Sequence, residues 1–165
     1  ESSSTAFSVS GPGSPSRTAS TGCPASRENE VADLQAAVTD THALLFHAAG
    51  GRALGKKAAA FFARAERREA IVYVPAAVMW ECSLLARVGR VNLRRSVRGF
   101  FDDLFSNPAY QPLDLTPAEV CLADELRFTR DPFDALIVAA ACQANLPLIT
   151  RDAVIRSSGT VSVVW

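Results

Sequence analysis

The chain has 165 residues, of which 48% are hydrophobic and 21% are charged. This composition is typical of a folded domain of ordinary size and excludes an entirely disordered chain. The 17 basic and 17 acidic residues cancel, and that total argues against a uniformly basic nucleic-acid-binding protein or an acidic tail protein. The total conceals an uneven distribution, because residues 52–98 carry eleven basic and three acidic residues, whereas residues 99–165 carry four basic and nine acidic ones.

The sequence pattern also leads us to expect neither a membrane protein nor a secreted one. No apolar run approaches the roughly 20 residues that a membrane-spanning helix needs, and the Ser-rich start lacks the basic and apolar regions of a secretory signal. The four cysteines lie far apart and form no C-x-x-C pair, which predicts reduced thiols rather than a disulfide framework or a zinc site. We therefore expect a cytoplasmic protein with no membrane association.

The first 30 residues differ in composition from the rest of the chain. Ser, Thr, Pro and Gly account for 18 of these 30 residues, and no hydrophobic periodicity is present. Such a segment buries too little apolar surface to offset the entropy cost of ordering. We interpret residues 1–30 as a flexible tail, whether native, vector-derived or translated upstream of the true start, and residues 31–165 as one folded domain.

Strands and helices are predicted to alternate in the first half of the domain. The apolar run 36–39 predicts a strand, and residues 41–47 predict a short helix that Gly50 and Gly51 close. Helical spacing of apolar residues continues over 55–69, and a β-rich run follows at 71–74. We expect a helix from Pro75 to Arg87 and an amphipathic helix over 93–105.

The alternation continues in the second half. Residues 110–113 predict a weak strand, and a capping box at Thr116 begins a helix to about residue 128. Asp131-Pro132 begins a second helix through residue 144, and strands are predicted at 146–150 and 161–165. This order of elements favours an α/β fold with a largely parallel sheet.

Four acidic residues stand where a parallel sheet would gather them. Asp40 follows the first strand, Glu81 lies early in the helix after the second, Asp134 lies in the first turn of a helix, and Asp152 follows the strand at 146–150. Carboxylates held together repel one another unless a cation such as Mg²⁺ or Mn²⁺ neutralises them. Each acid alone is explained as a helix cap or turn residue, but their joint placement predicts a metal-dependent nuclease.

Four segments of the chain resemble, in the same order, the acidic motifs of the PIN-domain ribonucleases: 40–46, 80–81 following 74–75, 130–137, and 148–152. The final strand at 161–165 is similar to the last strand of one branch of the VapC-type toxins within that family. The resemblance covers roughly residues 36–165, and four ordered motifs are far more specific than any one of them.

The resemblance implies a three-layer α/β/α fold with a central parallel sheet of about five strands. It also implies Mg²⁺- or Mn²⁺-dependent hydrolysis of RNA, a toxic role, a cognate VapB-like antitoxin as partner, and a homodimer. The acids that it assigns to catalysis and metal binding are Asp40, Glu81, Asp134 and Asp152. Thr41 and Thr150 would orient carboxylates or water, and Asp131 is interpreted as a helix cap in a supporting role.

Arginine accounts for 15 of the 17 basic residues, and it suits bidentate contacts with phosphate better than lysine does. Five arginines cluster around one predicted helix–helix junction and are candidates for RNA binding: Arg87, Arg90, Arg94, Arg95 and Arg98. A solvated face with ion pairs explains this cluster equally well, and the same helices are candidates for the antitoxin or dimer surface.

Two other functions remain open. The first is a PIN-like domain without a toxic role, acting in RNA processing or as a binding module. The second is a phosphatase or phospho-receiver on a related α/β sheet. A haloacid-dehalogenase-type phosphatase needs a second Asp two residues after the first, and His42 occupies that position. The sequence therefore disfavours the second alternative.

Overall fold

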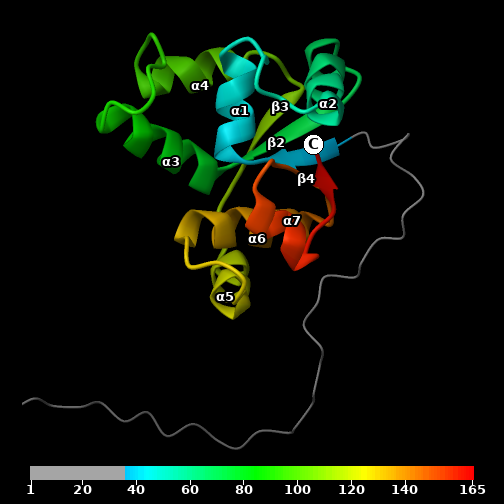
Figure 1. Ribbon diagram of the computed structural model, residues 1–165. Helices are drawn as coiled ribbons and strands as arrows, with labels where there is room; N and C mark the ends of the chain where they lie inside the picture. Colours follow the sequence, from blue (N-terminus) through cyan, green and yellow to red (C-terminus); the bar gives the residue numbers. More distant parts are fainter. Residues whose placement is uncertain (1–35) are drawn as a thin grey trace, which may run out of the picture.

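Five short parallel strands form the centre of the molecule in the computed structural model, which describes residues 36–165 (Figure 1). The strands are β1 (Ala36–Thr39), β2 (Ile71–Pro75), β3 (Tyr110–Leu113), β4 (Leu148–Ile149) and β5 (Val163–Val164). Their order in the sheet is β3-β2-β1-β4-β5, so β1 is central and later strands add to either side of it. The expected tail at 1–30 lies outside the described residues.

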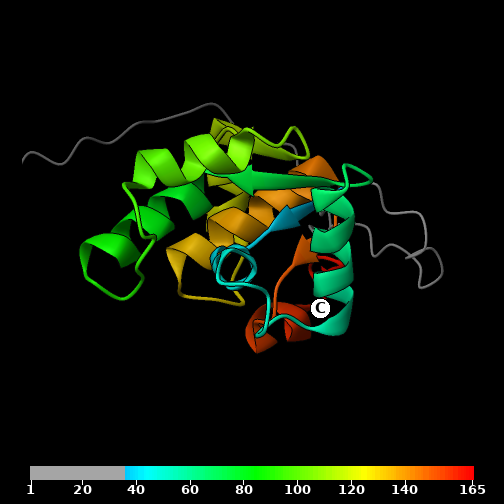
Figure 2. The same cartoon turned by 90° about the horizontal axis from the view of Figure 1, so that it is seen from above.

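In the described part of the chain, seven helices surround this sheet: α1 (Thr41–Ala48), α2 (Lys56–Glu66), α3 (Ala76–Arg87), α4 (Val97–Phe105), α5 (Pro117–Glu125), α6 (Pro132–Ala144) and α7 (Ala153–Ser158). Figure 1 shows α1, α2 and α4 on one side of the sheet and α5, α6 and α7 on the other. Figure 2 looks down through these layers, with α1 (cyan) seen along its axis. Helix α3 contacts α1 in one layer and α6 in the other. The predicted three-layer α/β/α fold with five parallel strands is confirmed.

The core lies on both faces of the sheet because alternate residues of β1 point to opposite sides. Ala37 belongs to a buried cluster with Phe61 and Phe62 of α2. Val38 belongs to a second buried cluster with Ile137 of α6 and Leu148 of β4. Burial of a large apolar side chain stabilises the fold by about 1.5–3 kcal/mol. Both helical layers are therefore held against the strands that carry the site.

Two helices have ends that differ from the prediction. Helix α4 begins at Val97 rather than residue 93, because Arg94 has a left-handed φ of 59° and Ser96 accepts a hydrogen bond from the Gly99 amide at 3.1 Å. Helix α5 ends at Glu125 rather than near residue 128, because Leu126 is already extended with a ψ of 112°. The last two strands are also shorter than predicted.

One helix was not predicted from the sequence. Helix α7 has six residues, and its N-cap is Asp152. The Asp152 Oδ1 atom accepts hydrogen bonds from the amides of Val154 at 2.7 Å and Ile155 at 2.9 Å. So short a helix shows too little hydrophobic periodicity to be recognised, and its cap is the only strong local signal.

The cysteines differ in state. Cys82 is buried and free, burial raises the pKa of its thiol to about 12, and Cys121 is exposed and free. Cys142 is disulfide-bonded, so the prediction of reduced thiols is wrong at this position.

Within residues 36–165, every helix is too short or too polar to cross a membrane.

Candidate active site

Asp40 and Asp152 lie at the carboxyl ends of two neighbouring strands, β1 and β4. The order of the sheet reverses at β1, and ligands of open parallel sheets bind in the crevice at such a switch point. The Asp40 amide donates to the Ile149 carbonyl at 3.1 Å, which joins the two strand ends. Asp40 is also the N-cap of α1, where its Oδ1 accepts a hydrogen bond from the Ala43 amide at 2.6 Å.

Glu81 approaches this edge of the sheet from α3. Its side chain is partly buried, and its Oε2 accepts a hydrogen bond from the hydroxyl of Thr41, which is itself buried at the start of α1. The bond joins α1 to α3 directly beside Asp40. The Thr41 hydroxyl therefore holds one oxygen of the Glu81 carboxylate.

Asp134 is the third residue of α6 and is partly buried. Its Oδ2 accepts a hydrogen bond from the Thr129 hydroxyl at 3.3 Å. Burial, and then the negative charges of Asp131, Asp152 and Glu81, together raise the pKa of Asp134 to about 6, although the hydrogen bond from Thr129 opposes the rise. Asp134 therefore lies within the electrostatic field of three other carboxylates.

The burial of Asp40 also disfavours its charged form. The residue is 7% exposed, and burial raises its pKa, while the Ala43 amide, Thr150 and His42 oppose that rise and Glu81 adds to it. Thr150 is fully buried after β4, and its Oγ1 accepts a hydrogen bond from the Asp152 amide at 3.0 Å. Thr150 thus connects the surroundings of Asp40 with those of Asp152.

Asp131 serves as the N-cap of α6, and its Oδ1 accepts a hydrogen bond from the Phe133 amide at 2.8 Å. The Thr129 hydroxyl, which donates to Asp134, accepts from the Asp131 amide at 3.0 Å. Asp131 therefore shapes the turn that presents Asp134, and its own charge acts on Asp134 through space.

The four predicted acids form a series of interacting pairs rather than a closed cage. Asp40 interacts with Glu81, Glu81 with Asp134, and Asp134 with Asp152. In the described part of the chain, no three or more Asp, Glu, His or Cys side chains converge closely enough to enclose a metal ion. The donors are all carboxylate oxygens, which are the ligands that Mg²⁺ and Mn²⁺ prefer, and Mg²⁺ usually binds one or two carboxylates and several waters.

The arginine cluster occupies the end of α3, the following loop and the start of α4. Arg95 pairs with Asp103, and Arg98 pairs with Asp102 at 3.6 Å on an exposed surface, as expected of a solvated face. The backbone of Arg94 is held by Asn92.

Arg87 and Arg90 lie near Glu81 or its neighbour in sequence, Trp80. The Arg87 guanidinium lies 5.5 Å from the ring centroid of Trp80, the residue before Glu81. Arg90 lines a pocket of about 430 Å³ together with Glu81, Leu84, Leu85, Val88, Asp131 and Phe133.

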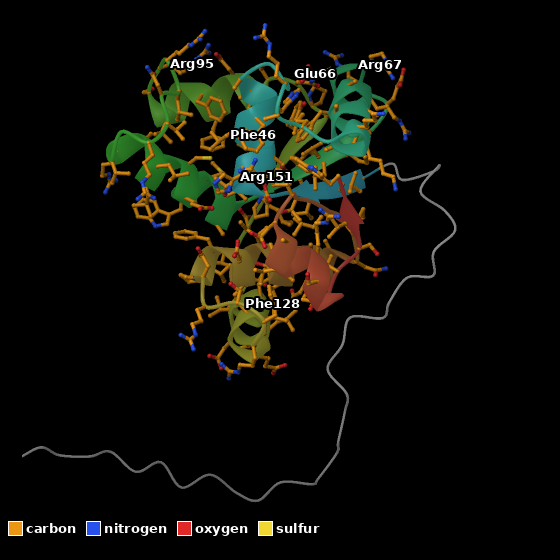
Figure 3. The ribbon with its side chains drawn as sticks, viewed as in Figure 1. Phe46, Glu66, Arg67, Arg95, Phe128 and Arg151 are labelled. Atoms are coloured by element: carbon orange, nitrogen blue, oxygen red, sulfur yellow. The ribbon has the colours of Figure 1, made fainter. Side chains whose placement is uncertain are left out.

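Another arginine, Arg151, was missed by sequence reasoning. Its Cζ lies 4.7 Å from the ring centroid of Phe46 on α1, and Figure 3 shows the two side chains together near the carboxyl end of the strands. Its place between Thr150 and Asp152, two residues of the fourth motif, was the one signal in the sequence that pointed to it.

A second polar cluster lies at the amino end of β3, away from the acids. The Tyr110 hydroxyl donates to Glu66 Oε1 at 2.6 Å, and His47 Nε2 lies 2.9 Å from the same oxygen. The hydrogen bond from Tyr110 holds the pKa of Glu66 below its ordinary value. His47 also stacks on Phe62 at 4.3 Å between ring centroids. His47 therefore ties α1 to α2 and β3 as a structural residue.

Comparison with known proteins identifies the class. Residues 37–158 match the PIN domain family, and because this match spans well over half of the chain, the protein belongs to that family. No curated protein sequence is significantly similar to the chain.

Among solved structures, the fold is similar to VapBC2 from Rickettsia felis bound to a promoter DNA fragment, with 14% identity, a TM-score of 0.57, and 78% of this chain and 96% of that chain covered. It is similar to PAE2754 from Pyrobaculum aerophilum, with 20% identity, a TM-score of 0.52, and 79% of this chain and 83% of that chain covered. It is also similar to FitAcB from Neisseria gonorrhoeae, with 19% identity, a TM-score of 0.51, and 78% and 96% covered. At these identities the likeness establishes the fold alone.

Proposed function

We propose that this PIN domain is a divalent-metal-dependent endoribonuclease that uses Mg²⁺ or Mn²⁺, and that it is the toxin of a toxin–antitoxin pair. The observation that carries the proposal is the series of repelling carboxylates at the switch point of the sheet, from Asp40 through Glu81 and Asp134 to Asp152. Membership of the PIN domain family supports nuclease chemistry.

The four acids would together hold the cation. A bound divalent ion would acidify a water molecule and offset negative charge on the phosphodiester. The chain's own groups prepare the ligands: Thr41 holds the Glu81 carboxylate, and Thr129 holds that of Asp134. Because burial and mutual repulsion disfavour the ionised acids, a cation would relieve a cost that the metal-free protein bears.

Two observations support a protein partner. Structures with the same fold include one described as VapBC2 and one described as FitAcB, so we infer a VapB-like antitoxin as partner here. The homodimer that the family resemblance implies is part of the same proposal. Trp80 is 53% exposed and Val88 is 66% exposed, beside the pocket that Glu81 lines. Exposed apolar side chains of this size favour a surface that a partner covers.

The direct test uses the full-length protein and a labelled single-stranded RNA. We expect cleavage with Mg²⁺ or Mn²⁺, no cleavage with EDTA, and a loss of about a hundredfold or more in Asp40→Asn and in Asp134→Asn. Circular dichroism checks that both variants fold, and Asp124→Asn on the exposed end of α5 is the matched control. Unchanged cleavage in EDTA would contradict the proposal.

The toxic role has a separate test. We expect expression of the wild-type chain to arrest growth, expression of Asp40→Asn to leave growth unaffected, and a small protein from the neighbouring reading frame to relieve the arrest. RNA cleavage without growth arrest would instead favour the alternative of a PIN domain that acts in RNA processing.

A further inference from the structure

Arg151 is placed by the backbone at the rim of the acid series. It follows Thr150, which contacts Asp40, and precedes Asp152, which caps α7. The main chain therefore fixes the start of this side chain beside two of the acids. The side chain is exposed and lies over the ring of Phe46, which is partly buried in α1.

The stack on Phe46 orders the guanidinium without using its hydrogen-bond donors. A guanidinium that lies 4.7 Å from a ring centroid is within the range of a cation–π contact. Within residues 36–165, Arg151 makes no ion pair with a carboxylate and donates no hydrogen bond. Its N–H edges are therefore available for a planar anionic group such as a phosphate.

Two arginines of the α3–α4 junction are less available for this role, and Arg87, which lies over the Trp80 ring, is not adjacent in sequence to a site acid. Arg95 and Arg98 already have their charges matched by Asp103 and Asp102. Arg151 is unpaired, ordered by an aromatic ring and adjacent in sequence to two residues of the site. The acids repel a phosphate that approaches them. Arg151 could offset this repulsion, because its backbone lies between Thr150 and Asp152.

We propose that Arg151 binds a phosphate of the RNA substrate at the rim of the acid series, and that Phe46 is the positioning residue that holds its guanidinium there. This inference rests on the proposed ribonuclease function and adds a residue to its binding site. Figure 3 shows the pair to which the proposal refers.

The first test measures RNA binding as a function of salt. The full-length Asp40→Asn protein, which leaves RNA intact, is titrated with a fluorescein-labelled single-stranded RNA at several salt concentrations. Loss of one phosphate contact in Arg151→Ala should lower the slope of log affinity against log salt by about 0.7. The matched control is Arg67→Ala, an exposed arginine that pairs with Glu69 at the far end of α2, which should leave the slope unchanged.

The second test examines the positioning role of Phe46. In the cleavage assay, Phe46→Leu should raise KM, because it removes the ring that positions the guanidinium but leaves the acids in place. Arg151→Lys should also raise KM, because an ammonium lacks the planar fork that binds phosphate through two donors. Phe46→Tyr keeps the ring and should leave KM at the wild-type value. In a protein that already carries Arg151→Ala, Phe46→Leu should raise KM little further, since both changes remove the same contact.

The outcomes separate the two proposals. If the wild-type protein fails to cleave RNA with Mg²⁺ or Mn²⁺, the ribonuclease function itself is wrong. If the wild-type protein cleaves RNA and Arg151→Ala keeps both the wild-type KM and the wild-type salt slope, the function stands and the role of Arg151 is overturned. A change in thermal stability alone, without a change in salt slope, also overturns it, because the stack is then only structural.

Discussion

Asp134 is the residue whose chemistry differs most from its ordinary behaviour in water. Its pKa in the folded protein is about 6, above the ordinary value of 3.8, because the carboxyl is partly buried and faces Asp131, Asp152 and Glu81. The folded state therefore holds a proton that the unfolded state releases between these two pH values. The stability that this proton contributes is fully present below about pH 4 and is lost as the pH rises through 6.

We predict that metal-free Asp134→Asn is more stable than the wild type at pH 7 by about 1–2 kcal/mol, after allowance for solvent screening. The difference should shrink towards pH 4. Urea unfolding in EDTA at four pH values measures it, with Asp124→Asn on exposed α5 as the control that should follow the wild type. If the free energies of unfolding of the wild type and Asp134→Asn changed with pH in parallel, the pKa of Asp134 would not be raised by burial and by its neighbours.

Thr41 offers a test of how the site is held together. Thr41→Val keeps the shape of this buried residue but removes the hydroxyl that donates to Glu81. We expect the apparent affinity for Mg²⁺, measured by titrating cleavage activity, to fall by about tenfold to a hundredfold. Thr41→Ser should recover most of it. An unchanged Mg²⁺ titration in Thr41→Val would mean that Glu81 needs no support from α1.

At the residue scale, the sequence predicted the acids because their motifs have a recognisable spacing. Arg151 was missed although it lies within the fourth motif, because its contact with Phe46 crosses more than a hundred residues of chain. Local spacing does not reveal such a contact. The pairing of Arg95 and Arg98 with aspartates, by contrast, is local and matches one of the two readings that the sequence left open.

At the scale of single elements, helix caps decide where the site residues lie. Helix α5 shows the full capping box: the Glu119 amide donates to Thr116 Oγ1 at 3.2 Å, and the Thr116 amide donates to Glu119 Oε2 at 2.8 Å. Glu119 is 4% exposed, so its carboxylate is committed to this role. Asp40, Asp131 and Asp152 also cap helices, each by accepting hydrogen bonds from backbone amides of the first turn, and these three residues lie in the site.

We predict that Thr116→Ala lowers the free energy of unfolding by about 1 kcal/mol, because α5 loses its side-chain cap. RNA cleavage per folded molecule should stay at the wild-type level, since α5 packs on α6 and carries none of the proposed acids. Urea unfolding measures the loss, and Glu119→Gln is the control that can still complete the box. No loss of stability in Thr116→Ala would contradict the capping role.

Element boundaries were predictable where a capping motif marks them and unpredictable where it does not. Helices α5 and α6 begin one residue after Thr116 and Asp131, as predicted. The start of α4 was misplaced because the left-handed conformation of Arg94 leaves no sequence signal in a non-glycine residue. Helix α7 was missed because the Asp152 cap precedes only six helical residues.

At the scale of the whole molecule, alternation of strands and helices was sufficient to predict a parallel sheet, because parallel neighbours need crossover connections. The order β3-β2-β1-β4-β5 was not readable from local pattern, yet it brings Asp40 beside Thr150 and Asp152. The pairwise arrangement of the acids was also beyond the sequence, because it depends on how α3 and α6 pack against each other.

The zero net charge of the whole chain reflects two parts of opposite charge. Asp134 and Asp152 belong to the acidic part of the chain, 99–165, whereas the basic part, 52–98, contains Glu81 and the α3–α4 junction. A divalent ion bound by the acids would leave the molecule with a net positive charge. The balance therefore gives no argument against RNA binding once a cation is present.

In our proposal, Asp40, Glu81, Asp134 and Asp152 together hold a divalent cation for RNA cleavage. The most direct test is the anomalous diffraction of Mn²⁺ in crystals of the active protein grown with that ion. We expect an anomalous peak among these four carboxylates that is lost in Asp134→Asn. A protein that cleaves RNA with Mn²⁺ but shows its peak elsewhere, or no peak at all, would contradict it.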